Sequence, residues 1–485
     1  MMFNEINFLV FFVVIVGIYF YIPYRFRWIV LLISSYYFYM GLKIELGVLL
    51  LFSTFTAYSL AILIHRTENP KKRKRYLYLN LLTNLGLLFI FKYFNFVSES
   101  VRKFLDIFSI KVDPILIKVL LPIGISFYTF QTLSYTIDVY RKRIKPERHF
   151  GIFALYVAFF PQLVAGPIER ASNLLPQFFE KHNFNYKNAT DGLKLILWGF
   201  FKKIVIADRL ALVVNSVYGN PTDYGGIPLL LATFFFTFQL YCDFSGYCDI
   251  AIGTTQVMGF RLSDNFNRPY FSRSIAELWN RWHISLTSWF QDYVFKPLYL
   301  DLYRKFMFFE NLSQKQLHFI SFYISTLIGL TLLGLWHGAE WTFVAFGAYH
   351  AIMISIYYSI RRYWDMMNQY IRILLTFVIF AIGLVFFRAN SISDAFFIIT
   401  HLFSNWSFFF SGVDLGSIEG FYGIGLAFTC ILFLESIHLM QEHVGMRSFL
   451  SKKPIWIRWP IYYAIILSIL LFGIFKQSDF IYFQF

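Results

Sequence analysis

Two histidines of the segment "GLWHGAEWTFVAFGAYHA", residues 334–351, lie in a part of the chain where charged side chains are scarce. A neutral imidazole in a water-poor cavity of low dielectric accepts a proton from a hydroxyl group, which is what attack on an acyl thioester requires. His337 is the candidate for this role, because Gly338 lets a substrate or another backbone approach it, and Trp336 and Trp341 are placed to wall a pocket. A single buried histidine also suits a purely structural role.

The other potentially reactive side chains of the chain give weaker signals. His350, thirteen positions after His337, is better explained by packing between helices than by chemistry. There is no Gly-x-Ser-x-Gly motif and no Ser or Cys convincingly placed beside a base, so covalent catalysis is not indicated. Cys242, Cys248 and Cys430 are too few for a disulfide framework, and no Cys or His pair has zinc-ligand spacing. The sequence therefore predicts neither a metal site nor a permanently bound cofactor.

Two aspartates interrupt the apolar run "LLLATFFFTFQLYCDFSGYCDIAIGTTQVMGF", residues 229–260. A carboxylate in a transmembrane segment costs about 2.5–3.5 kcal/mol on insertion scales, so it normally faces a partner or a cavity. Asp243 and Asp249 are six residues apart and fall on different faces of a helix, which argues against a shared-proton pair unless Gly246 breaks that helix. Structural pairing with arginine or backbone, and lining of a polar cavity, both remain open.

A third polar stretch, "ELWNRWHISLTSWFQDYVFKPL", covers residues 277–298. Glu277 and Arg281 stand at i and i+4 and are expected to pair on a helix. An interfacial or partly re-entrant helix is predicted, with His283 either a polar residue of the interface or a contact for substrate. Three tryptophans suit the headgroup region of a bilayer: Trp279, Trp282 and Trp289.

The composition of the chain indicates that the candidate residues lie on or between membrane helices. Hydrophobic residues make up 58% of the 485 positions and charged residues only 15%, which fits no ordinary soluble domain. We predict an all-α polytopic membrane protein, with the single integral membrane domain 1–485 and roughly 10–12 spans of about 20 residues each. The windows are residues 6–24, 28–42, 46–64, 76–95, 115–137, 192–215, 227–258, 319–336, 341–360, 371–387, 420–438 and 457–475.

Basic clusters between these windows predict the orientation of the chain. Residues 25–27, 66–76 and 141–149 are rich in Lys and Arg, whereas residues 98–113 carry balanced charges. Because cytoplasmic loops are enriched in basic residues, we place those three clusters in the cytoplasm and the amino terminus outside. The same arrangement explains the net charge of +15 without nucleic acid as a partner. The first window lacks a cleavage site and is expected to remain as an anchor.

The sequence resembles the membrane-bound O-acyltransferases, and within them the branch that O-acetylates alginate. The resemblance runs along most of the chain in ordered blocks, and the last of them is the terminal "FIYFQF". These blocks cover residues 27–40, 89–96, 121–141, 159–170, 243–253, 265–295, 334–350 and 480–485.

The resemblance implies roles for particular residues. The His of the "WHG" block, His337, is expected to be catalytic, and the His of the "RWHIS" block, His283, to support activity. Asp243, Asp249 and the tryptophans Trp336, Trp341 and Trp282 are candidates for a central acyl-transfer tunnel. The chain departs from the family pattern at Gln291, usually Arg, and lacks a Gly pair after Leu298, which affects the local loop and any contact that it makes with the donor.

The function implied is transfer of an acetyl group from cytoplasmic acetyl-coenzyme A for O-acetylation of an exported polysaccharide or cell-wall glycan. Transfer is direct or passes through a periplasmic acetyltransferase- or esterase-like partner, and the protein is expected in a bacterial cytoplasmic (inner) membrane. The alternative is a D-alanyl or other acyl transferase that takes its acyl group from a carrier protein. A transporter is the other class that uses intramembrane Asp and His.

Overall fold

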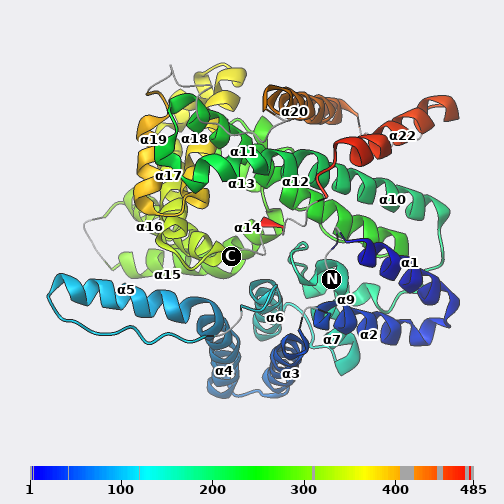
Figure 1. Cartoon of the computed structure of the whole chain (residues 1–485). Helices are drawn as coiled ribbons and strands as arrows, with labels where there is room; N and C mark the ends of the chain where they lie inside the picture. Colours follow the sequence, from blue (N-terminus) through cyan, green and yellow to red (C-terminus); the bar gives the residue numbers. More distant parts are fainter. Residues whose placement is uncertain are drawn as a thin grey trace. The chain divides into compact units, whose positions relative to one another are not determined.

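The computed structural model describes residues 3, 5–41, 43–118, 121–308, 312–404, 420–444, 450, 452–475 and 480–481. Every regular element in these residues is a helix, which confirms the all-α prediction (Figure 1). The chain forms two compact units: unit 1 holds residues 1–196 and 251–263, and unit 2 holds residues 197–250 and 264–485. The chain passes between the units three times: inside α10 (Tyr186–Phe200), inside α12 (Gly226–Met258) and between residues 263 and 264.

Unit 1 is built around α3, which packs against both α4 and α6. Asn69 caps the start of α4 by accepting hydrogen bonds from the backbone N–H groups of Lys71 and Lys72, and Pro70 occupies the first turn, where its missing N–H is not needed. The buried hydroxyl of Ser53 donates to Asn84 across the α3–α4 interface, which satisfies both polar groups. Besides part of α10 and the end of α12, the elements of unit 1 are α1 (Ile6–Tyr21), η1 (Tyr24–Phe26), α2 (Arg27–Met40), α3 (Ile44–Arg66), α4 (Pro70–Leu88), η2 (Phe89–Tyr93), α5 (Phe94–Ile107), α6 (Ile125–Tyr140), α7 (Phe150–Ala158), α8 (Phe160–Leu163) and α9 (Ala171–Gln177).

Unit 2 contains the long helices that carry most of the candidate residues. The helical run that starts as α10 continues through the π-helix η3 and α11, and α12 continues without a break through Gly246. The elements are η3 (Phe201–Ala207), α11 (Asp208–Gly219), η4 (Pro221–Asp223), most of α12, η5 (Pro269–Phe271), α13 (Ile275–Arg281), α14 (Ile284–Phe290), η6 (Gln291–Phe295), α15 (Lys296–Phe306), α16 (Gln314–His337), α17 (Trp341–Met366), α18 (Gln369–Arg388), α19 (Ile392–His401), α20 (Gly420–His443) and α22 (Ile455–Phe472).

The antiparallel pair α16 and α17 sets the position of His337. A Cβ atom at Gly334 would overlap the carbonyl oxygen of Phe343, and one at Gly347 would overlap that of Leu330. These two glycines therefore let the helix backbones approach closely, as small residues do in membrane helix pairs. Gly338 is the C-cap of α16 and is covered by the Phe343 ring. The space left by its missing side chain is therefore filled by Phe343.

Eight helical segments of the described residues are long and apolar enough to cross a membrane, which confirms a multi-pass protein. They are Ile44–Arg66, Pro70–Ile107, Gly226–Met258, Gln314–His337, Trp341–Met366, Gln369–Arg388, Gly423–Glu442 and Ile455–Phe472.

The four remaining windows form helices that are shorter or more polar than a simple span. The first two windows contain α1 and α2, of 16 and 14 residues. In window 115–137 the helix begins only at Ile125, after Pro122 and after Gly124 with a left-handed φ of 80°, a conformation that glycine adopts at little cost. Window 192–215 is helical throughout but contains the buried pair Lys202 and Lys203.

Candidate active site

His337 is the last residue of α16, and its side chain is only 5% exposed. Its ring centroid lies 4.9 Å from that of Trp336, 6.0 Å from that of Phe346 and 5.2 Å from that of Phe387. Aromatic rings of α16, α17 and α18 therefore surround the imidazole and keep bulk water from it. This is the environment in which a neutral imidazole acts as a base.

A polar cavity of about 360 Å³ opens beside these rings in unit 2. Phe387 lines the cavity and also contacts His337, so one aromatic side chain joins the imidazole to this space. Polar side chains from four segments line this cavity. Because polar groups are rare in so apolar a chain, their convergence here indicates a ligand site. The lining residues are Lys203, Asp208, Ala211, Asn215, Phe236, Gln239, Asp243, Glu340, Phe343, Phe387, Arg388, Ala389, Asn390 and Ile481.

Gln239 gives this cavity an unused hydrogen-bonding group. Its side chain is 94% buried, since only 6% is exposed, and its Oε1 atom has no hydrogen-bond partner among the residues that the structure describes. Buried polar atoms in proteins are nearly always hydrogen-bonded. A hydroxyl or N–H group of a bound ligand would satisfy this oxygen.

A network of buried charges joins η3 to α12. Lys203 Nζ lies 2.7 Å from Asp243 Oδ1 and 2.9 Å from Asp208 Oδ1, and Lys202 Nζ lies 2.7 Å from Asp249 Oδ2. Both aspartates singled out in the sequence are therefore paired with a lysine, Asp243 with Lys203 and Asp249 with Lys202. They lie on different faces of α12, which is not broken between them. Asp243 also lines the cavity, so it combines the two roles considered from the sequence, ion pairing and cavity lining. Asp249 does not line the cavity.

The sequence did not predict the lysines of this network, although two adjacent lysines in an apolar run are as costly as the aspartates and signal buried carboxylate partners. The two lysines lie in a π-helix, and this also indicates a functional site, because π-bulges are frequent at such sites.

The network also binds a segment near the carboxyl terminus. The backbone N–H of Ile481 donates to Asp243 Oδ2 at 2.9 Å, and the Phe480 ring centroid lies 4.5 Å from Lys203 Nζ. Both residues are buried, and Ile481 forms part of the cavity wall. These are the first two residues of the terminal block "FIYFQF"; its last four lie outside the described residues.

His283 lies near the same aromatic cluster. It separates α13 from α14 with a left-handed φ of 43°. The predicted single interfacial helix is therefore broken at this residue into the short α13 and a run of α14, η6 and α15. Its ring is 6.0 Å from that of Trp336, which also contacts His337. The two candidate histidines thus pack against one tryptophan.

Asn265 fixes the tautomer of His283. The Oδ1 atom of Asn265 accepts hydrogen bonds from the backbone N–H of Ser285, from the Ser285 hydroxyl and from His283 Nδ1. Because a backbone N–H can only donate, this Asn265 atom is the carbonyl oxygen, and His283 Nδ1 must carry the proton. Burial lowers the pKa of His283 to about 3. The ring is therefore neutral at physiological pH, with Nε2 as its basic nitrogen.

The tryptophans predicted for a headgroup region or a tunnel occupy different places. Trp336 is buried in the cluster described above, whereas the Trp341 side chain is 53% exposed, and neither lines the cavity. Trp282, with Trp279 and Trp289, is buried inside unit 2 and not at its surface, because these rings pack against other aromatic side chains. The predicted pair Glu277–Arg281 is present at 2.7 Å.

His350 has the packing role expected for it. It is fully buried, its Nδ1 bonds with the carbonyl oxygen of Phe346 one turn earlier, and its ring fills the space left by Gly383 of α18. The departures from the family pattern lie further along the chain. Gln291 begins η6, and the helix α15 continues through Leu298, so the region where the family has a Gly pair is helical here.

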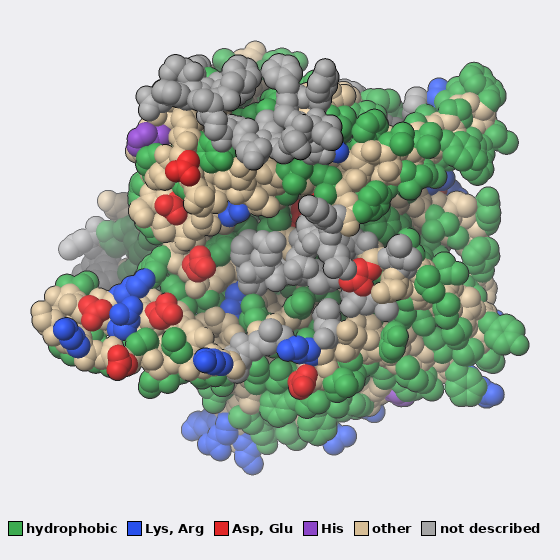
Figure 2. Space-filling model, viewed as in Figure 1, with side chains coloured by type: hydrophobic (Ala, Val, Ile, Leu, Met, Phe, Trp, Pro, Cys, Tyr) green, Lys and Arg blue, Asp and Glu red, His purple; other side chains and the backbone are tan. Residues whose placement is uncertain are grey.

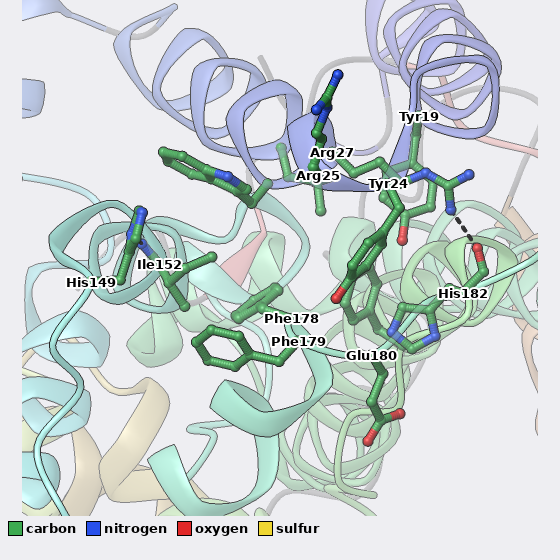
Figure 3. Close-up of a pocket in the computed structure, with 13 residues that line it drawn as sticks. Tyr19, Tyr24, Arg25, Arg27, His149, Ile152, Phe178, Phe179, Glu180 and His182 are labelled. Carbon is green, nitrogen blue, oxygen red and sulfur yellow. Dashed lines mark hydrogen bonds between the residues drawn. The ribbon is translucent and has the colours of Figure 1, made fainter.

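A second cavity, of about 220 Å³, lies in unit 1 and is lined mainly by aromatic side chains (Figure 3). Three of its polar side chains have partners in the protein. Arg27 donates to the backbone carbonyl of His182 and to two other carbonyls, and His149 Nδ1 accepts the N–H of Ile152 as a helix cap. The ring of His182 bonds with the Gln177 carbonyl. None of the predicted catalytic residues lies there, so the candidate site is the cavity of unit 2.

Comparison with known proteins gives a family and several similar proteins. The sequence model of the membrane-bound O-acyltransferase family matches residues 141–393, which include both candidate histidines. The chain is 35% identical over 439 residues to the probable alginate O-acetylase of Pseudomonas aeruginosa, covering 88% of this chain and 79% of that protein. It is 34% identical over 400 residues to the peptidoglycan O-acetyltransferase of Helicobacter pylori, covering 76% and 72%. The teichoic acid D-alanyltransferase of Streptococcus thermophilus is 30% identical over 248 residues, covering 48% and 56%.

Proposed function

Since the chain belongs to the membrane-bound O-acyltransferase family, we propose that it transfers an acetyl group from cytoplasmic acetyl-coenzyme A to a hydroxyl of an exported polysaccharide, directly or through a periplasmic partner protein. Acetyl as the group is supported by the names of the two relatives that are matched over most of their length, an alginate O-acetylase and a peptidoglycan O-acetyltransferase. Their bacterial origin supports the cytoplasmic membrane as the location.

In the proposed reaction His337 removes the proton of the acceptor hydroxyl as that oxygen attacks the thioester carbonyl carbon. The new O–C bond forms and the C–S bond breaks, and the proton passes from His337 to the departing coenzyme A sulfur. The products are an acetyl ester and a free thiol. His283, whose neutral ring packs on the same tryptophan, holds the aromatic cluster and orients a polar group through Nε2.

The observation that carries this proposal is the position of His337 beside the cavity of unit 2. Phe387 contacts the imidazole and lines the cavity, and Gln239 offers an unused acceptor to a ligand hydroxyl. The aromatic rings around His337 exclude bulk water from the imidazole, which favours transfer of the acetyl group to a bound hydroxyl over hydrolysis.

The sidedness of the helices supports an acceptor that approaches from outside. The helix ends of α16, α17 and α18 that lie away from the cavity carry Lys315, Arg361, Arg362 and Arg372. The opposite ends carry His337 and the cavity residues Glu340 and Arg388. By the positive-inside rule we expect the first set to face the cytoplasm and the cavity to lie toward the outer side.

The cytoplasmic location predicted for the basic cluster 66–76 gives an expected labelling of two exposed lysines at opposite ends of one helical run. A Lys72→Cys variant should react with a membrane-impermeant maleimide only after the cytoplasmic side is opened, whereas Lys103→Cys should react in intact cells. The native cysteines are buried and give a low background. Reaction of both positions from the same side would overturn the orientation.

The donor is tested with purified protein in lipid vesicles. We expect radiolabelled acetyl-coenzyme A to lose its acetyl group to an ester on added glycan or on a periplasmic acceptor protein, with stoichiometric release of thiol. The control is the His337→Ala variant in the same vesicles. Use of an acyl-carrier thioester in place of acetyl-coenzyme A would establish the D-alanyl-transferase type of reaction, and solute uptake without ester formation would establish a transporter.

A further inference from the structure

Helix α5 leaves the end of a membrane span as an isolated arm. Residues 76–93, which complete α4 and η2, provide about 27 Å of helix at 1.5 Å per residue, close to the roughly 30 Å of a hydrocarbon core. The π-helix η2, which completes this span, leads directly into α5. In Figure 1 α5 runs across the view while α4 is strongly foreshortened, so the two axes meet at a steep angle. A helix that turns in this way at the end of a span lies along the membrane plane.

The sequence of α5 separates apolar and charged side chains onto opposite faces. Val97, Val101 and Phe104 of α5 and the C-cap residue Phe108 follow the spacing i, i+4, i+7 and i+11, which places them on one face of a helix. The charged face has the spacing i, i+3, i+4 and i+7. Its members are Glu99, Arg102, Lys103 and Asp106.

The apolar face of α5 is not covered by the described part of the protein. Val97 is 39% exposed, Val101 50%, Phe104 59% and Phe108 61%, and η2 is the one described element that packs closely on the helix. The segment that follows, residues 108–118, returns to the start of α5, where the Asn95 side chain both donates to the carbonyl and accepts from the N–H of Ile117.

The returning segment enlarges the exposed apolar surface of the arm. Besides Phe108, four apolar side chains of this segment are about half exposed or more: Ile110, Val112, Ile115 and Leu116. Water-soluble surfaces rarely expose so much contiguous apolar area, so this arm has a partner.

We propose that residues 94–118 form an in-plane anchor that inserts the apolar face of α5 into the lipid interface, at the end of α4 opposite the basic segment 66–75. The steep turn after a membrane-spanning helix and the continuity with that helix both place the arm at the level of the headgroups.

The charged face of α5 fits water above the bilayer. Two acidic and two basic side chains balance one another, and Arg102 pairs with Asp106 at 3.6 Å along the helix. Figure 2 shows side chains of both signs together along this arm. A face with no net charge provides no electrostatic attraction for an acidic or basic protein surface. The lipid is therefore held by the apolar face and not by headgroup charge, so binding is expected to be insensitive to salt.

Spin labels on the two faces of α5 test the proposal in the full-length protein, reconstituted in vesicles of phosphatidylethanolamine and phosphatidylglycerol. Phe104→Cys carries the label on the apolar face and Lys103→Cys on the charged face, one residue away. Both positions are exposed and the native cysteines are buried, so labelling is specific and should leave folding unchanged. Collision rates with oxygen, which concentrates in lipid, and with a water-soluble nickel chelate are measured for each label.

We expect the ratio of oxygen to nickel accessibility to be several-fold higher at position 104 than at position 103, and unchanged when salt is raised. Equal access of nickel to both labels would show that the arm projects into water and would overturn the anchor. Shielding of the label at position 104 from oxygen and nickel alike would show that protein covers this face, a second copy or another chain, and would also overturn it.

Discussion

Replacing His337 by alanine is expected to lower acetyl transfer by about 10²–10⁴-fold, the usual effect of removing a general base, while the protein still inserts and folds. The imidazole is enclosed by the rings of Trp336, Phe346 and Phe387. His337 reaches the cavity through Phe387, and no histidine is among the described lining residues of that cavity. Ester-linked acetate on the glycan, normalised to the amount of enzyme in the membrane, is the quantity to measure.

His350→Ala is the matched control for this variant. His350 is a buried histidine of the neighbouring helix that packs against Gly383 and bonds with the Phe346 carbonyl, so its loss removes packing and not a base. We expect lower stability, of the order of a few kcal/mol for a large-to-small change, with near-normal turnover per folded molecule. Equal loss of turnover in the two variants would mean that packing explains His337 as well.

Most of the membrane architecture was predictable, because long uncharged windows leave few alternatives to a spanning helix. Window 115–137 failed as one helix for a local reason, since Pro122 and Gly124 precede a helix that starts at Ile125. Window 192–215 is helical throughout, but it carries two buried lysines for a long-range reason. Lys202 and Lys203 are tolerated inside the protein because aspartates from another helix pair with them, and hydropathy alone does not reveal such partners.

The candidate site was predictable only in part, because some of its contacts join residues that lie far apart in the sequence. His337 and Asp243 could be identified because polar groups in an apolar run are costly and need an explanation. The contact of Ile481 with Asp243 spans 238 positions in sequence, and no local pattern predicts it. Likewise the aromatic spacing around Trp279 and Trp282 suits an interface and a protein core equally, and only packing against residues such as Phe380 distinguishes them.

The two aspartates of α12 are expected to respond differently to replacement, because their lysines have different second partners. Asp249→Ala leaves the buried ammonium of Lys202 with the Ser245 hydroxyl, at 2.9 Å, as its remaining hydrogen-bond partner in the described structure. Breaking a buried ion pair on one side costs about 3–5 kcal/mol. Asp243→Ala leaves Lys203 paired with Asp208 and should destabilise the protein less. Thermal unfolding of the purified variants in detergent measures the difference.

The double variant Lys202→Met/Asp249→Leu separates the charge effect from packing. Replacing a whole buried ion pair by apolar side chains of similar size is often neutral or stabilising, so this variant should regain most of the thermal stability that Asp249→Ala loses. Asp243→Ala should instead lose acetyl transfer per folded molecule, since Asp243 lines the cavity and fixes the backbone of Ile481 in its wall. Two outcomes would contradict these roles. One is a larger loss of stability in Asp243→Ala than in Asp249→Ala, and the other is full turnover without the Asp243 carboxylate.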